Sequence, residues 1–321
     1  MSPEQKRAPR PENVEGDFFV DKGCIDCMTC RWVAPDSFSA VGLQAAVTRQ
    51  PATPEERLAA MQALYSCPVH SIHVRHRDPS EVRTAQASLP RAWPTEAPGV
   101  YAAGWHSEAS FGGAGWLLTR PGRGNVLVDA PRFTPQLAAR LEELGGVEYI
   151  FLTHKDDVAD HAKWAAHFGA ARVIHAGEAN AHQGTDACEV QLSGPGPSWP
   201  FPDGDDDLTI IHTPGHTEHH LVLFSARHKA LFSGDHLSGV EGDNSHWRPD
   251  DGRLYIFTEA NWYSVPEQLE SVKALLDYDW LHVLPGHGMP ARVPDAAARL
   301  AAVSDLLARH AGAAAPARAA W

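Results

Sequence analysis

One stretch, residues 147–161, limits the folds that this chain can adopt. It reads VEYIFLTHKDDVADH, so a short apolar run ends abruptly in a dense group of imidazoles and carboxylates. A short apolar run bounded by polar residues predicts a buried strand. In open α/β layers, binding sites lie at the carboxyl ends of strands. Because imidazole and carboxylate bind zinc, iron or manganese, the stretch predicts a metal site at a strand tip.

Three later polar stretches also follow apolar strands: TPGHTEHH at 213–220, SGDH at 233–236 and PGHG at 285–288. Strands alternate with helices from residue 100 to about 312, which predicts an α/β domain of two packed sheets with helices outside. A single histidine at a strand end is usually a solvated loop residue, but several in succession favour a metal site. The candidate ligands are His154, Asp156, Asp160, His161, His216, Asp235 and His287.

The order of these motifs resembles the metallo-β-lactamase fold superfamily. Its pattern is His-x-His-x-Asp-His, then a histidine in a Gly-His-Thr turn, an aspartate in a Gly-Asp turn and a late Gly-His. The resemblance covers nearly all of residues 100–312 and implies an αββα sandwich with one or two divalent metal ions (Zn, Fe or Mn). It also implies the ligand sets: His154 and His216 for one metal, Asp160, His161 and His287 for the other, and Asp235 between them.

The spacing departs from the family pattern. The family steps four positions from the first histidine to the aspartate, whereas His154 to Asp160 is a step of six. If His154 is aligned, Asp156 takes the place of the second histidine and two residues are inserted before Asp160. We prefer this register, because the family places its first ligand in Leu-Thr-His at a strand end. If Asp160 and His161 are aligned instead, Asp156 and Val158 replace the two histidines.

A carboxylate at the second-histidine position favours a harder metal such as iron or manganese. The flavodiiron branch of the superfamily, a redox branch, also has an acid there. The sequence leaves open which of Asp156 and Asp157 is a ligand, and the simpler interpretation of Asp157 is the N-cap of the helix that follows. His219 and His220 are expected to lie behind the ligands or in solvent, and Cys188 is expected to be a small buried hydrophobe.

Four of the five cysteines lie near the N-terminus, at Cys24, Cys27, Cys30 and Cys67, the last before a proline. This C-x2-C-x2-C run with a distant C-P resembles the bacterial single-cluster ferredoxins and implies a [4Fe–4S] cluster on all four cysteines. A zinc knot is the alternative, but zinc sites usually pair cysteines as two C-x2-C hooks. Flanking strands and a helix at about 54–65 predict a small α+β domain.

The chain divides into five predicted segments. A disordered polar tail at 1–16 precedes the ferredoxin-like domain at 17–77. A linker rich in proline, serine and charge follows at 78–99. The metallo-β-lactamase-like domain spans 100–312, and a low-complexity tail closes the chain at 313–321.

Composition excludes several classes of partner. The formal net charge of -13 disfavours nucleic acid, which needs a basic surface. No apolar run approaches the length of a membrane helix, and the N-terminus has no apolar core of a signal peptide. We therefore expect a cytoplasmic protein without a membrane partner, in which clustered thiols stay reduced and bind metal.

These features predict a metal-dependent hydrolase, in which activated water attacks an ester, a thioester or a related bond of a small molecule. Asp235 or Asp160 would handle protons. An alternative is a non-haem iron oxidoreductase fed electrons by the cluster, with an electron donor protein or reductase as partner. A second alternative is a redox sensor or scaffold without catalysis. No substrate is evident from the sequence.

Overall fold

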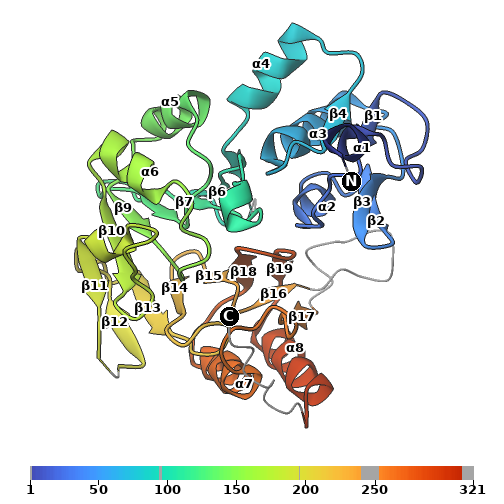
Figure 1. Cartoon of the computed structure of the whole chain (residues 1–321). Coiled ribbons are helices and arrows are strands. Elements are labelled where there is room, and N and C mark those ends of the chain that lie inside the picture. The colour runs from blue at the N-terminus through green and yellow to red at the C-terminus, as the bar shows by residue number, and fades with distance from the viewer. Residues whose placement is uncertain (1, 94–95, 195, 240–252, 313–321) are drawn as a thin grey trace.

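The protein is described from a computed structural model, which covers residues 2–93, 96–194, 196–239 and 253–312. The tail predicted at 313–321 lies outside the described residues. A small N-terminal domain lies beside a larger two-sheet domain (Figure 1).

The small domain is built from two short antiparallel strand pairs and three helices. Its elements are α1 (Pro3–Arg7), β1 (Phe18–Val20), α2 (Thr29–Val33), β2 (Phe38–Val41), β3 (Gln44–Val47), α3 (Pro54–Ser66) and β4 (Ile72–Val74). Strand β1 pairs with β4, and β2 pairs with β3. Helix α3 matches the predicted helix because Thr53 accepts a hydrogen bond from the Glu56 N–H and Pro54 occupies its first turn.

The predicted disordered tail is wrong for the described residues before position 17. Ser2 caps α1, and Arg7 donates to the carbonyl of His70 at 2.8 Å. Arg10 is buried and donates to the carbonyls of Ala45 and Val41. The polar composition suggested disorder, but these guanidinium groups satisfy backbone carbonyls of the small domain.

The predicted linker at 78–99 is also partly wrong. It contains helix α4 (Pro79–Ala87), which Asp78 caps by accepting from the Ser80 N–H at 2.7 Å. It also contains β5 (Arg91–Ala92), which pairs with the first sheet of the large domain. Proline interrupts the segment, but its caps and edge pairing still allow short regular elements.

The first sheet of the large domain has seven strands in the order β11-β10-β9-β8-β7-β6-β5. Pairing is antiparallel from β5 to β8 and parallel from β8 to β11. The remaining strands are β6 (Val100–Ala102), β7 (Trp116–Leu118), β8 (Val126–Val128), β9 (Tyr149–Phe151), β10 (Ala171–His175) and β11 (Val190–Leu192). Its helices are η1 (Glu108–Ser110), α5 (Pro135–Glu143), α6 (His161–Phe168) and η2 (Thr185–Ala187).

The second sheet has six strands in the order β12-β13-β14-β15-β18-β19. Strands β14 and β15 are consecutive and pair antiparallel as a hairpin. The strands are β12 (Ser198–Pro200), β13 (Leu208–His212), β14 (Leu221–Ser225), β15 (Ala230–Gly234), β18 (His282–Pro285) and β19 (Ala291–Arg292). The other elements are β16 (Ser238–Gly239), β17 (Leu254–Tyr255), α7 (Val265–Ala274), η4 (Leu275–Asp277) and α8 (Ala296–Arg309).

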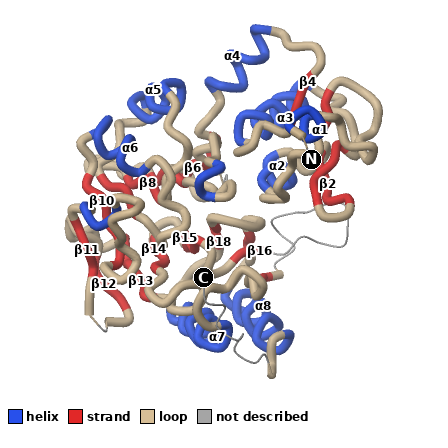
Figure 2. The backbone as a smooth tube through the Cα atoms, viewed as in Figure 1, coloured by secondary structure: helices blue, strands red, loops and turns tan. Residues whose placement is uncertain are grey.

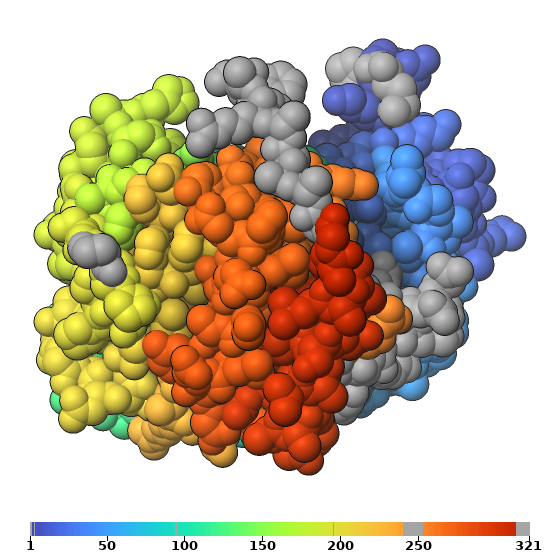
Figure 3. All heavy atoms as spheres, turned by 90° about the horizontal axis from the view of Figure 1, so that it is seen from below, coloured from blue at the N-terminus to red at the C-terminus, as the bar shows by residue number. Residues whose placement is uncertain are grey.

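Alternation of side chains along the strands produces the layers. In β8, Val126 and Val128 join a core that includes residues of both sheets, whereas Leu127 joins a core with α5 and α6. In the second sheet, Leu223 faces the shared core and Val222 packs with α7 and α8. Figure 2 shows the helices outside the strands, and Figure 3 shows α7 and α8 as an outer face. The predicted αββα sandwich with a small N-terminal domain is confirmed.

A continuous hydrophobic core joins the two domains. Trp32 of α2 stacks on Trp116 of β7, with ring centroids 5.8 Å apart, and both side chains are buried. Arg91 of β5 donates to the carbonyl of Val33 at 2.9 Å. These contacts hold the cysteine loop in a defined position against the large domain.

Candidate metal centre

The polar cluster at the end of β9 is organised by a buried threonine. Thr153 Oγ1 donates to the carboxylate of Asp129 at 3.0 Å, and it lies 2.9 Å from Nδ1 of His154. Because the hydroxyl proton goes to Asp129, the oxygen accepts from Nδ1–H of His154. Nε2 of His154 is then left with a free lone pair, and it is buried without a hydrogen-bond partner. The hydrogen bond between Thr153 and His154 therefore fixes His154 as the tautomer whose Nε2 can bind metal.

A first group of ligand atoms forms around that nitrogen. His154, Asp156 and His216 each offer one ligand atom, and these atoms lie within 4.8 Å of one another. Oδ2 of Asp156 is 3.7 Å from Nε2 of His154 and 3.9 Å from Nε2 of His216. The three residues come from two loops, after β9 and after β13, so the two sheets meet at this point.

Asp235 lies beside this first group and also belongs to a second one. Oδ2 of Asp235 lies 3.8 Å from Nε2 of His154 and 3.7 Å from Nε2 of His216. Oδ1 of Asp235 is 2.9 Å from Nδ1 of His287, and Oδ2 of Asp157 is 3.7 Å from the same nitrogen. Asp235 therefore lies between two groups, as the resemblance implied.

Asp157 is a site residue whose role as a ligand the sequence left open. Its carboxylate is buried, and neither oxygen has a hydrogen-bond partner. A Cβ at Gly113 would lie 2.6 Å from its Oδ1, and a Cβ at Gly286 would lie 2.4 Å from its Oδ2. Only glycine leaves room for the carboxylate at these two positions. The consecutive aspartates at 156 and 157 were the available signal, but an N-cap explained Asp157 more simply.

Asp160 and His161 are not brought into this group, contrary to the prediction. Oδ2 of Asp160 accepts from the Phe133 N–H at 2.7 Å, and Oδ1 pairs with Lys163. Nε2 of His161 contacts the carbonyl of Gln183 at 3.0 Å. Helix α6 begins at His161, so the two extra residues of this loop carry both side chains past the ligands. Asp157 occupies the place that they were expected to fill.

The site has the donor set that a divalent cation requires. Several nitrogen and oxygen atoms that face one another are buried without a hydrogen-bond partner. They are Nε2 of His154, Oδ2 of Asp156, both Oδ atoms of Asp157 and Nε2 of His216. Burying an unpaired carboxylate costs several kcal/mol, which a bound cation offsets. The residues present therefore fit one metal at His154, Asp156 and His216 and a second at Asp157 and His287, with Asp235 shared.

Electrostatics at the site agree with this fit. Burial lowers the pKa of His216 to about 4, so the imidazole is neutral and can bind metal at pH 7. Burial alone would lower the pKa of His287 as well, but the neighbouring carboxylates of Asp235 and Asp157 outweigh it and raise that pKa well above its usual value. The excess of carboxylate at this end of the site attracts a positive charge.

The four N-terminal cysteines line one cavity in the small domain, together with apolar residues such as Val20 and Ile72. None of the four is in a disulfide, and Sγ of Cys67 accepts a hydrogen bond from the Ser71 N–H at 3.2 Å. Tetrahedral zinc would hold sulfurs about 3.8 Å apart. Among the described residues, no group of three ligand atoms within 4.8 Å includes a cysteine. The predicted [4Fe–4S] cluster would be held by all four of these cysteines.

The cysteine loop also forms a wall of the metal centre. A cavity of about 570 Å³ is lined by Asp26, Cys27 and Met28 on one side. On the other side it is lined by the candidate ligands Asp156, Asp157, His216, Asp235 and His287. The polypeptide is in close contact here, because a Cβ at Gly112 would lie 2.7 Å from Cβ of Cys27.

His106 lies behind this wall. Its Nδ1 is 3.0 Å from Oγ1 of Thr29 and 2.9 Å from the carbonyl of Gly112, and Thr29 in turn lies 3.5 Å from Sγ of Cys27. Burial lowers the pKa of His106 to about 4. A neutral imidazole therefore connects the cysteine loop to the loop that faces the metal centre.

Family comparisons agree with both halves of the molecule. Residues 111–287 match the family model described as the metallo-beta-lactamase superfamily. The chain belongs to this superfamily. Residues 20–74 match the model described as the 4Fe-4S single cluster domain of ferredoxin I, and this range contains all four clustered cysteines.

Individual relatives are distant. The chain is 29% identical over 157 residues to a hydroxyacylglutathione hydrolase of Tolumonas auensis. This match covers 49% of this chain and 56% of the relative. It is 32% identical over 126 residues to a protein of the same name from Rhizobium etli, which covers 38% and 47%. The chain thus spans about half the length of these curated relatives.

A solved structure described as a peroxy diiron species of the chemotaxis sensor ODP is 19% identical to this chain, with a TM-score of 0.46. The match covers 60% of this chain and 87% of that one. Among the described helices of this superfamily member, none is both long and apolar enough to cross a membrane.

Proposed function

We propose that this chain is a metal-dependent hydrolase that acts on a small acyl compound, with a thioester as the first substrate class to test. The observation that carries the proposal is the set of buried, unpartnered ligand atoms that opens into the 570 Å³ cavity. Relatives named hydroxyacylglutathione hydrolase support hydrolysis and suggest the thioester.

The side chains have distinct roles in this proposal. His154, Asp156 and His216 would hold one divalent ion, and Asp157 and His287 would hold a second, with Asp235 shared. The ions would supply Lewis-acid activation of water at neutral pH. Asp235, which reaches both groups and borders the cavity, is placed to accept a proton from the attacking water. Asp160, also predicted to move protons, is tied to Phe133 and Lys163 and has no part in the proposal.

The test is turnover by anaerobically purified protein loaded with Zn²⁺, Mn²⁺ or Fe²⁺, against thioester, ester, lactam and phosphodiester substrates. We expect thioester hydrolysis that is lost in Asp235→Asn. His182→Gln, which changes an exposed histidine outside the centre, should retain it. The absence of turnover with every metal and substrate would refute the proposal.

A second candidate is a non-haem iron oxidoreductase that receives electrons from the N-terminal cluster. Cys27 lines the same cavity as the candidate metal ligands, which supports electron transfer from a cluster that this cysteine would hold. The carboxylates of Asp156, Asp157 and Asp235 also favour a harder metal than a set of imidazoles would. This candidate requires an electron donor protein or reductase as partner.

One experiment separates the two candidates. The cluster is reduced anaerobically, the acceptor O₂ is added, and the visible absorption of the cluster is followed with Fe²⁺ or Zn²⁺ in the second centre. Zinc is not redox-active. Reoxidation that is much faster with iron would support the oxidoreductase, and equal rates with both metals would exclude electron transfer through the centre.

A further inference from the structure

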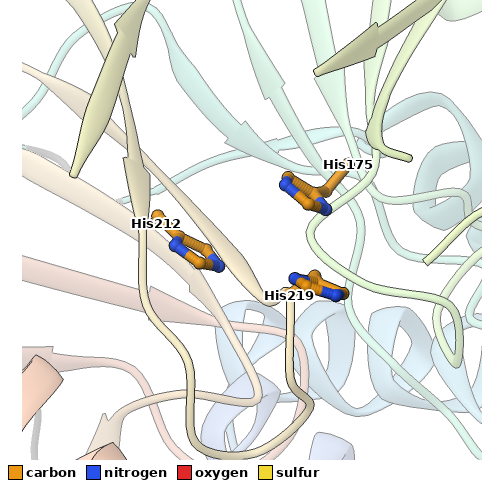
Figure 4. Close-up of side chains that lie close together, drawn as sticks. All are labelled: His175, His212 and His219. Atoms are coloured by element: carbon orange, nitrogen blue, oxygen red, sulfur yellow. The ribbon is translucent and has the colours of Figure 1, made fainter. Parts of the chain in front are cut away.

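A second group of histidines lies outside the centre described above. His175, His212 and His219 each offer one ring nitrogen, and these nitrogens lie within 4.8 Å of one another. Figure 4 shows the three rings close together, with His212 to one side of His175 and His219. The ring planes are nearly parallel, and the centroids of His175 and His219 are 4.4 Å apart. We call these three residues the histidine triad. None of them belongs to the ligand groups of the metal centre.

The triad joins the two sheets. His175 is the last residue of β10 in the first sheet, and His212 is the last residue of β13 in the second. His219 comes from the loop between β13 and β14. Trp199 of β12 packs against one side, with its ring 5.8 Å from His175 and 5.9 Å from His212. The triad therefore depends on the tertiary fold.

The triad contains buried polar atoms without partners. Nε2 of His175, Nε2 of His212 and Nδ1 of His219 are all buried and make no hydrogen bond. A buried polar atom that stays unsatisfied destabilises the fold, and a bound cation would remove that cost. His175 is 5% exposed, whereas His212 and His219 are partly exposed, so one side of the triad remains open to solvent.

A buried carboxylate adds negative charge beside the triad. Glu178 is 3% exposed and acts electrostatically on His175 and His212. Its Oε1 accepts from the His219 N–H at 3.1 Å, and its Oε2 accepts from the Lys155 N–H at 3.2 Å. One carboxylate thus connects the triad to the loop that carries His154 and Asp156.

We propose that the histidine triad is a further binding site for a divalent transition metal, best suited to Zn²⁺, which holds the two sheets together beside the metal centre. Three imidazoles with an open fourth position form a typical zinc ligand set, and the open side would admit water. Tetrahedral zinc needs its nitrogens about 3.4 Å apart, and rotation of the two partly exposed rings can bring them together.

Coordination has a specific consequence at His175. Its Nδ1 now accepts from the Gly177 N–H at 3.1 Å. A neutral imidazole that binds metal through Nε2 carries its proton on Nδ1, so this contact must open. Zinc binding should therefore free the Gly177 amide.

The test uses the full chain with its cluster intact. Zinc and cobalt equivalents per chain are measured after chelation and reloading, alongside acid-labile sulfide. We expect His212→Gln and His219→Gln each to lose about one metal equivalent relative to the wild type, with sulfide content unchanged. His182→Gln, an exposed histidine outside the triad, is the matched control and should lose none.

A second measurement does not depend on any variant. Crystals of the wild type soaked in Zn²⁺ should show an anomalous peak between the three rings. Equal metal content in the wild type and the folded triad variants, or no peak between the rings, would show that the triad is only a ring stack and would overturn the proposal.

Discussion

The cysteine cavity and the carboxylate-rich metal centre face each other but are assembled in different ways. Three of the four cysteines lie within seven consecutive positions, 24–30, and the fourth follows helix α3 of the same domain. The metal centre instead collects His154, Asp156 and Asp157 from one loop, and His216, Asp235 and His287 from three others. Local spacing is enough to define the first site, whereas the second depends on how two sheets pack.

The difference also affects tolerance to change. Ligands on one short loop keep their geometry as long as the loop keeps its length. The family pattern of the cysteines can therefore be applied directly to this sequence. A dispersed site can replace one ligand by another when a loop changes, because other segments hold the remaining ligands in place. In this chain Asp157 lies at the metal centre, whereas Asp160 and His161, which the family pattern predicts as ligands, lie away from it.

The largest effect is expected from removing one cysteine of the cavity. Cys67→Ala should lose most of the cluster iron and acid-labile sulfide, because a [4Fe–4S] cluster needs all four thiolates. Visible absorption and sulfide analysis measure the loss. Cys188→Ala, which changes the buried cysteine outside the cavity, is the control. A Cys67→Ala protein with full sulfide content would contradict the cluster assignment.

The next largest effect is expected at the metal centre, in the loop after β9 whose spacing departs from the family pattern. Asp157→Asn should weaken metal binding by at least about 100-fold, because it removes a buried charge that faces the centre. Asp160→Asn should leave metal content unchanged, since an amide oxygen can still accept from the Phe133 N–H. Metal titration of the two variants decides whether Asp157 or Asp160 binds the metal. The opposite result would restore the ligands that the family pattern predicts.

A smaller effect is expected one residue before the first ligand. Thr153→Val should lower metal affinity by about 10–100-fold, because it removes the hydroxyl that orients His154. Thr153→Ser keeps the hydroxyl and should bind metal almost as well as the wild type. If valine and serine behave alike, the hydroxyl does not set the form of His154.

The smallest effect concerns the open side of the cavity. Trp262 lines the cavity and is 57% exposed, so Trp262→Ala should raise KM for a substrate about fivefold, or about 1 kcal/mol. Leu43→Ala, at an exposed position in the small domain, should leave KM unchanged. Steady-state kinetics at constant metal content provide the comparison. An unchanged KM in Trp262→Ala would place the substrate elsewhere.

Much of the candidate site could be predicted from short motifs. His154, His216, Asp235 and His287 follow apolar strands, and a strand tip is a position that hydrophobic pattern alone can locate. Asp157 could not be predicted in the same way. Its role depends on Gly113 and Gly286, which approach it from distant segments and leave space only for its carboxylate.

The structure of polar segments was also difficult to predict from their composition alone. Arg10 lies in a run that composition alone suggests to be disordered, but it is buried against the β2–β3 hairpin. The histidine triad could not be recognised from the sequence, because the packing of the sheets brings His175 to His212 and His219, which lie in a separate stretch.

The sequence by itself determined the superfamily, the αββα sandwich, the cysteine cavity and the strand tips that carry the metal centre. The two packed sheets with helices outside follow from hydrophobic periodicity, whereas the superfamily, the cluster and the ligand motifs follow from the resemblance of short segments to known families. Only the tertiary structure decided that Asp157 faces the metal centre while Asp160 and His161 lie away from it, that Cys27 borders the metal centre and that three histidines meet. Each of these depends on which side chains face a shared space after distant segments have packed, and no local pattern encodes that.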